Sequence, residues 1–317
     1  MAVLRWAFCG LSAALIAAGS ASAAPAGDPE ATVIDQLIVG ARQPGPAWWR
    51  VSNANSVVYV LGVPGALPKG MSWDTAVVER RLKGANEVIA PPTVSAGAGD
   101  AIAVLSILNE LHTRTPMDDQ LPPALKARFE ADRGRLSSDP NAYSHWVPAV
   151  AGLQMVGDYR RKASLDAAEP AKTVRHLAEH EGVSFTPAAT YKAVPLFKAI
   201  AAQAGSVGPA CLSDALDEVE AGPAPASAVA QAWARGDVHA ALAEQRGYEK
   251  CVNRFPEGAA ITRVAMHDTA GAIATALGKP GHSVALVNLR ALLAPGGVLQ
   301  QLQARGFKVE KPDRAGD

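Results

Sequence analysis

The pattern of apolar and polar positions is most informative in the stretch that begins at residue 46. Residues 48–51 and 56–61 are apolar, β-favouring runs, and the Ser-Asn-Ala-Asn between them is typical of a turn. The second run ends at 62–65, Gly-Val-Pro-Gly, where two glycines and a proline turn the backbone sharply. This turn carries no side chain able to do chemistry. The stretch predicts strands over 48–51, 56–61 and 87–90 and a helix over 72–84, with Pro91 and Pro92 stopping the last strand.

Helical spacing of apolar residues dominates the rest of the chain, and prolines and glycines separate the segments. Residues 24–45 predict a tail with one short helix. The further helices predicted are 101–111, 124–135, 147–159, 171–181, 189–204, 209–220, 264–277 and 295–305, and the further strands are 182–185 and 281–287.

Composition excludes one broad class of function. The chain has 317 residues with 30 basic and 30 acidic side chains, and no basic stripe is interleaved with aromatic residues. Recognition of nucleic acid or of an anionic membrane surface needs such a stripe. We therefore expect neither partner.

The first 23 residues are typical of a secretory signal peptide. Arg5 supplies the positive end, residues 7–18 a short apolar core, and 21–23, Ala-Ser-Ala, a cleavage site. The apolar core is shorter than a membrane-spanning helix requires, and we expect no membrane span in the mature chain. The expected location is the periplasm or the extracellular space.

Two cysteines remain after such a signal is removed. An even number of cysteines in an oxidising compartment favours a disulfide, here between Cys211 and Cys251.

Several motifs resemble those of the TraB/GumN family, which is related to the Tiki-type metalloproteases. They are the Trp-Trp-Arg-Val and Tyr-Val-Leu-Gly of the first strands, the Leu-Pro-Lys-Gly at 67–70, the Trp-Ala-Arg-Gly-Asp at 233–237, and the Pro-Gly-Gly-Val-Leu that precedes Gly306-Phe307. At the fourth of these, Trp233 is expected to anchor packing, and Gly236 and Asp237 to cap successive helices.

The resemblance implies an α+β fold. We expect a mixed β-sheet built from two similar halves, with a helical insertion at about 101–180 and flanking helices. The predicted single domain covers 46–310, and 311–317 form a C-terminal tail.

The resemblance also implies a metal-dependent site whose side chains this chain lacks. The family's Gly-x-x-His corresponds to 62–65 and, a second time, to 288–291, so glycine and alanine stand where histidines are expected. Pro91 stands in place of a glutamate, and 185–188, Phe-Thr-Pro-Ala, in place of a Gly-x-Glu-Thr turn. Ala265 and Met266 stand in place of an Arg-Asn pair. None of these side chains can polarise a carbonyl or ligate a metal in the way such a mechanism requires.

One other sequence motif could indicate a metal site at a different place in the chain. His176 and His180 belong to a His-x-x-Glu-His sequence, which places two imidazoles one helical turn apart. The alternative is a solvated helix end, where the helix dipole favours histidine.

The remaining site candidates are Gly62, Gly65, Asn288 and Arg290, at the ends of strands expected to meet across one cleft. Arg290 is expected either to bind a carboxylate or phosphate there or to be a solvated arginine at the start of a helix.

The leading hypothesis is an exported, catalytically degenerate family member that binds a peptide or an envelope component and carries no cofactor. The alternatives are a metal-dependent hydrolase with a relocated site, using a divalent metal, and a structural partner of another exported protein.

Overall fold

The structure, a computed structural model, describes residues 27–37 and 45–312. The predicted signal peptide and residues 313–317 lie outside this part of the chain.

The described residues contain a six-stranded mixed sheet in the order β10-β1-β2-β9-β4-β7. Strands β2, β9, β4 and β7 are parallel to one another, whereas β1 runs antiparallel to both β2 and β10. The α+β prediction with a mixed sheet is confirmed. The bounds are β1 Trp48–Ser52, β2 Ser56–Val63, β4 Val88–Ala90, β7 Phe185–Pro187, β9 Gly281–Asn288 and β10 Lys308–Glu310.

The central pair of the sheet joins the two ends of the chain. Strands β2 and β9 pair in register from Ser56 opposite Gly281 to Val63 opposite Asn288. Parallel strands present their carboxyl ends at the same edge of a sheet. The turn after β2 and the helix after β9 therefore begin side by side.

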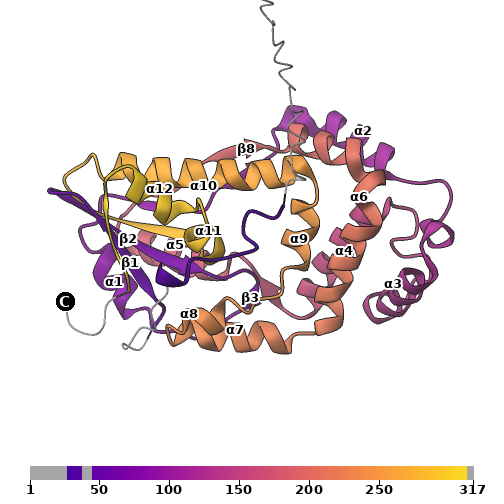
Figure 1. The fold of residues 1–317 in the computed structure, drawn as a ribbon, viewed down its shortest axis with the longest axis horizontal. Helices are drawn as coiled ribbons and strands as arrows, with labels where there is room; N and C mark the ends of the chain where they lie inside the picture. Colours follow the sequence, from indigo (N-terminus) through magenta and orange to yellow (C-terminus); the bar gives the residue numbers. More distant parts are fainter. Residues whose placement is uncertain (1–26, 38–44, 313–317) are drawn as a thin grey trace, which may run out of the picture.

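Helices cover both sides of the sheet (Figure 1). Helices α10 and α12 pack against each other on one side, and α1 and α5 on the other. The buried core between them includes the fully buried Trp49, Val60 and Ile273. The bounds are α1 Ala76–Leu82, α5 Glu169–His180, α10 Pro256–Ala276, α11 Leu289–Leu293 and α12 Val298–Ala304.

A second layer, the helical layer, stands beside the sheet and has smaller cores of its own (Figure 1). Helix α5, by contrast, contributes Val174 and Ala178 to the sheet core. The helical layer consists of α2 Ala101–Leu111, α3 Pro123–Leu136, α4 Pro148–Lys162, α6 Ala193–Ala221 and α9 Gly247–Asn253.

One predicted break is wrong. Residues 189–204 and 209–220 are not two helices, because α6 runs through Pro209 without interruption. The helix lies along α4, where a Cβ on Gly152 would stand 2.9 Å from the Ala215 side chain. Close packing along both halves of the helix outweighs the hydrogen bond that proline removes.

The Trp-Ala-Arg-Gly-Asp junction has the expected role. Trp233, on α7 Ala224–Ala234, donates its ring N–H to the buried carbonyl of Gly62 at 2.7 Å. Gly236 has a φ of 74° and follows the end of α7. The Asp237 side chain caps α8 Val238–Ala241 by accepting from Ala240 N at 3.0 Å. This junction holds the end of β2 in place.

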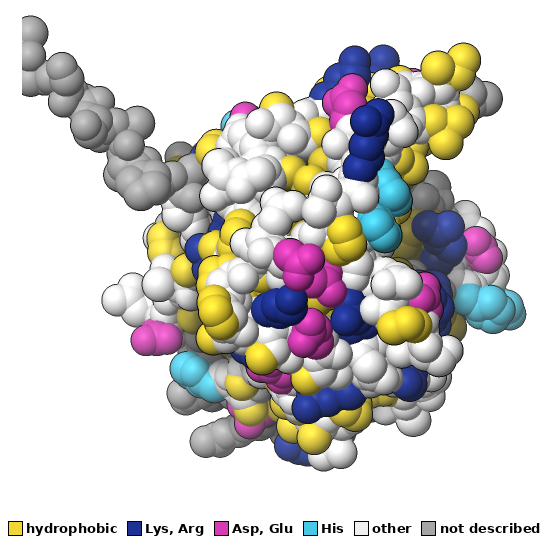
Figure 2. Space-filling model, turned by 90° about the vertical axis from the view of Figure 1, so that its right-hand side faces the viewer, with side chains coloured by type: hydrophobic (Ala, Val, Ile, Leu, Met, Phe, Trp, Pro, Cys, Tyr) yellow, Lys and Arg dark blue, Asp and Glu magenta, His cyan; other side chains and the backbone are white. Residues whose placement is uncertain are grey.

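The surface agrees with the balanced charge of the sequence. On the face shown in Figure 2, acidic and basic side chains lie interspersed rather than in a continuous patch of one sign. An ion-pair network between α3 and α6 is one example, with Arg128 2.7 Å from both Asp217 and Glu220. Within the described residues, no helix combines the length and apolar character that crossing a bilayer needs.

The predicted disulfide is present. Cys211 on α6 and Cys251 on α9 are bonded and fully buried, and the bridge closes a loop with a sequence separation of 40 residues. It fastens α9 to the longest helix of the helical layer.

Replacing both cysteines, as Cys211→Ala with Cys251→Ala, should lower the free energy of unfolding by about 4 kcal/mol, since the bridge restricts the unfolded chain. Urea denaturation of the variant and the oxidised wild type measures this difference. Reduced wild-type protein is the matched control and should fall to the same stability as the variant. Equal stability of all three samples would contradict the prediction.

Candidate functional site

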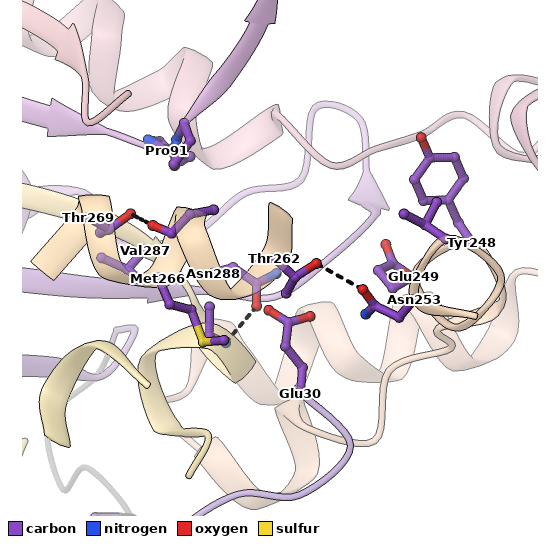
Figure 3. A pocket seen from close by; sticks show the side chains of 14 residues that line it. Glu30, Pro91, Tyr248, Glu249, Asn253, Thr262, Met266, Thr269, Val287 and Asn288 are labelled. Carbon is purple, nitrogen blue, oxygen red and sulfur yellow. Dashed lines mark hydrogen bonds between the residues drawn. The ribbon is translucent and has the colours of Figure 1, made fainter. Parts of the chain in front are cut away.

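A cavity of about 310 Å³ lies where the carboxyl ends of β4 and β9 meet α10, α9 and the N-terminal segment 27–37 (Figure 3). Apolar side chains supply much of its wall, and the polar ones gather toward α9. The lining residues are Glu30, Pro91, Pro92, Tyr248, Glu249, Val252, Asn253, Thr262, Ala265, Met266, Thr269, Val287, Asn288 and Ala291.

Several, but not all, of the positions at which the resemblance expects chemistry meet in this cavity; Gly65 and 185–188 are not in its lining. Pro91 follows β4, Ala265 and Met266 lie on α10, Asn288 ends β9, and Ala291 lies on α11. All five line the same space. Because none of them offers an imidazole, a carboxylate or a guanidinium, the cavity lacks the side chains that the resemblance implies for metal chemistry.

Gly62 and Gly65 lie beside the cavity rather than in its lining. Gly62 is part of the core, where an added Cβ would stand 2.6 Å from Leu289 and 2.9 Å from Trp49. Gly65 donates its backbone N–H to Glu244 Oε2 at 2.5 Å. A Cβ on Gly65 would meet the same oxygen at 2.9 Å. Both glycines thus permit close approach and leave ligand contact to other residues.

Asn288 and Arg290 both make internal contacts. The Asn288 side chain caps α11 by accepting from the backbone N–H groups of Arg290 and Ala291 at 2.9 and 3.1 Å. The Arg290 side chain is only 14% exposed, so it is not a solvated arginine. It donates to the carbonyl of Leu242, and its Nε lies 3.2 Å from Glu244 Oε1. Arg290 does bind a carboxylate, and that carboxylate belongs to the protein.

The N-terminal segment forms one wall of the cavity, which the sequence does not indicate. It runs between the sheet and the helical layer and passes α9 (Figure 1). Arg246, at the start of α9, contacts Asp28 at 2.7 Å and Glu30 at 3.2 Å. Asn253 donates to Asp28 at 2.8 Å. These bonds place the Glu30 carboxylate inside the cavity (Figure 3).

Buried carboxylates distinguish the α9 side of the site. Burial raises the pKa of Glu30, and the nearby Asp28 and Glu249 add to that rise against the Arg246 charge. Burial also raises the pKa of Glu249, with Glu218 adding to the shift and Arg160 opposing it. Burial raises the pKa of Glu244 to about 7, although the Gly65 N–H and Arg290 oppose the change. Protein groups with such shifts cluster at functional sites.

The sequence held one signal for these residues. Glu244, Arg246 and Glu249 alternate in sign directly after the Trp-Ala-Arg-Gly-Asp junction, in a segment that also begins a helix. That junction marks where the chain returns to β2. The signal for Glu30 was absent, because segment 27–37 has no periodic pattern.

The residues present do not fit a divalent metal. Within the described part of the chain, no three histidine, cysteine or acidic side chains are arranged to hold an ion. His176 and His180 are exposed on α5, and His180 is 82% exposed with Glu181 Oε1 3.9 Å from its ring. Two solvated imidazoles without a third ligand are a poor site for zinc.

Matches to known proteins agree with the resemblance. The TraB/PrgY/gumN family profile matches residues 47–311. A search of curated proteins and a search of solved structures each returned no match.

The fold and the cavity define an α+β protein with a pocket at the carboxyl edge of a mixed sheet. The chain belongs to the TraB/PrgY/gumN family.

Glu244 should make stability depend on pH. Its pKa is about 7 in the folded protein against an ordinary value of 4.5. Between these values the folded protein keeps a proton that the unfolded chain has lost. Stability therefore falls as pH rises through this window, by about 3 kcal/mol for this group, and levels off above it.

Glu244→Gln removes this ionisation. Between pH 5 and 8.5 the wild type should lose about 3 kcal/mol more stability than the variant, measured by urea denaturation. Glu130→Gln on α3, where the side chain is 45% exposed, is the matched control and should follow the wild type. A constant difference between wild type and Glu244→Gln at both pH values would show that Glu244 is ionised throughout.

Elemental analysis of the mature protein should find less than one zinc, cobalt or manganese per chain, since His176 and His180 have no third ligand. His176→Ala with His180→Ala should leave that content unchanged. One metal per chain in the wild type that the double variant loses would establish a relocated metal site.

Proposed function

We propose that this chain is an exported, catalytically degenerate member of its family that binds a peptide or an envelope component in the cavity. One observation carries the proposal: Pro91, Ala265, Met266, Asn288 and Ala291 line a single cavity of about 310 Å³. The space is that of a small ligand site, and its shape persists without the side chains for chemistry.

The wall chemistry suits binding. Ligand sites in proteins combine an apolar lining with a few placed polar groups. Here Met266 and Val287 supply apolar surface, whereas Glu30 and Glu249 supply charge. The Thr262 hydroxyl donates a hydrogen bond to Asn253 Oδ1 at 2.8 Å, and this bond holds the wall rigid. A rigid wall lowers the conformational entropy that the protein loses when a ligand binds.

Export is part of the proposal and rests on two features. The first 23 residues resemble a signal peptide, and the Cys211–Cys251 disulfide suits an oxidising compartment such as the periplasm.

A peptide-retention experiment tests the binding function. Mature wild-type protein is mixed with a random peptide pool and separated by size exclusion, and the bound and free peptides are identified by mass spectrometry. We expect retention of a subset of intact peptides. Ala265→Trp places a large side chain in the cavity and should reduce retention at least about tenfold, since that side chain occupies the space that the ligand needs.

Ala127→Trp, on the exposed side of α3, is the matched control and should retain peptides as the wild type does. Cleavage of the peptide pool by the wild type in the presence of zinc, cobalt or manganese would contradict the proposal that the protein is catalytically degenerate. Retention that Ala265→Trp leaves unchanged, or no retention at all, would overturn binding in this cavity.

A further inference from the structure

The α9 side of the cavity has more carboxyl groups than guanidinium groups. Arg246 forms ion pairs with Asp28 and Glu30. Arg160 forms ion pairs with Glu218 and Glu249, and Arg290 forms one with Glu244. Within the described residues, the cluster thus contains the carboxylates Asp28, Glu30, Glu218, Glu244 and Glu249 and the guanidiniums Arg160, Arg246 and Arg290.

Arg160 and Arg246 are each shared between two carboxylates. In each case the charge of the more distant carboxylate is less well neutralised. Arg160 lies 2.6 Å from Glu218 and 3.5 Å from Glu249, so Glu218 holds the closer contact. Arg246 lies 2.7 Å from Asp28 and 3.2 Å from Glu30. Glu30 and Glu249 are the weaker partners in each case, and they are the two that line the cavity.

Each of these two carboxylates has one oxygen that accepts no hydrogen bond from the described residues, but the Glu30 oxygen is accessible whereas the Glu249 oxygen is not. Glu249 Oε2 is shielded from solvent and accepts no hydrogen bond within the described residues. The Glu30 side chain is 10% exposed, and Arg246 contacts only its Oε2. Figure 3 shows the Glu30 carboxylate reaching into the cavity between Asn288 and Asn253, with Glu249 on the adjoining helix. A donor on a ligand can reach the accessible Glu30 oxygen, and the Glu249 carboxylate in the adjoining wall adds electrostatic attraction without direct contact.

The neighbouring polar groups do not supply that donor. Asn253 donates to Asp28 and accepts from Thr262. The Thr269 hydroxyl donates to the carbonyl of Ala265 at 2.7 Å, within its own helix. The donor for the accessible Glu30 oxygen therefore comes from water or from a ligand that enters the cavity.

We propose that the cavity recognises a primary ammonium group, which donates to Glu30 and is attracted by the nearby charge of Glu249, on a ligand whose adjoining apolar group packs against Met266 and Val287. An ammonium group carries three donors and one positive charge, which match the Glu30 oxygen that lacks a protein donor and the acidic side chains of this wall. The volume of about 310 Å³ suits a group of about the size of one amino acid. The proposal rests on the proposed binding function and names the ligand chemistry.

Two sources share this chemistry: the amino terminus of a peptide with an apolar first residue, and a simple amine. Isothermal titration calorimetry on the mature protein compares three probes. Leucyl-alanyl-alanine amide carries the ammonium group, 4-methylpentanoyl-alanyl-alanine amide lacks only that group, and 3-methylbutylamine keeps the ammonium and the apolar group without a peptide.

We expect the peptide without the amine to bind about 10-fold to 100-fold more weakly than leucyl-alanyl-alanine amide, the usual loss for a buried charged hydrogen bond. Glu249→Gln and Glu30→Gln should each reduce that discrimination, and Glu130→Gln on exposed α3 should preserve it. Thermal melts show whether each variant folds, and the wild-type comparison needs no variant. Binding of 3-methylbutylamine as tightly as the peptide supports an ammonium site that ignores the peptide backbone, whereas weaker binding assigns the site to a peptide amino terminus.

Equal binding of the two peptides, with Ala265→Trp blocking both, would overturn ammonium recognition and leave the binding function intact. Failure of all three probes to bind while the peptide pool is retained in the cavity would also overturn it. Failure of both the probes and the pool would overturn the two proposals together.

Discussion

The in-register pairing of β2 with β9 is the contact on which the rest of the structure depends. It joins Ser56–Val63 to Gly281–Asn288, two segments separated by most of the chain. Closing so long a loop costs conformational entropy that local contacts do not repay. The fully buried Val60, Leu61 and Leu286 contribute the apolar burial that offsets that cost. This pairing positions the carboxyl end of β9, which forms part of the cavity wall.

A second constraint is the burial of charge beside that edge. Arginines from three different segments, Arg160, Arg246 and Arg290, each hold buried carboxylates, and removing one partner of such a pair leaves an uncompensated charge. These pairs fasten the N-terminal segment and α9 to the sheet. The disulfide then ties α9 to α6. The polar wall of the cavity is thus fixed from both sides, which explains how a space without catalytic side chains keeps its shape.

Sequence patterns identified the sheet and most helices because their periodicity is local. Helix 101–111 was predicted to the residue, and strands 48–51 and 56–61 were close to their observed bounds. The split at Pro209 failed because packing of α6 on α4 overrides a local helix breaker. Of the motif positions, Pro91, Ala265, Met266, Asn288 and Ala291 line one cavity, whereas Gly62 and Gly65 serve backbone packing outside its lining.

By itself, the sequence determined the family, the α+β class, the cysteine pair and the absence of the expected metal-binding side chains from the motif positions. These depend on residue identity and on short-range periodicity, which can be read along the chain. Only the tertiary structure decided that Glu30 and Glu249 line one cavity and that Glu244 is buried beside Arg290. The electrostatic energy of a carboxylate depends on its burial and its neighbours in space, and neither property is encoded in the spacing of residues along the sequence.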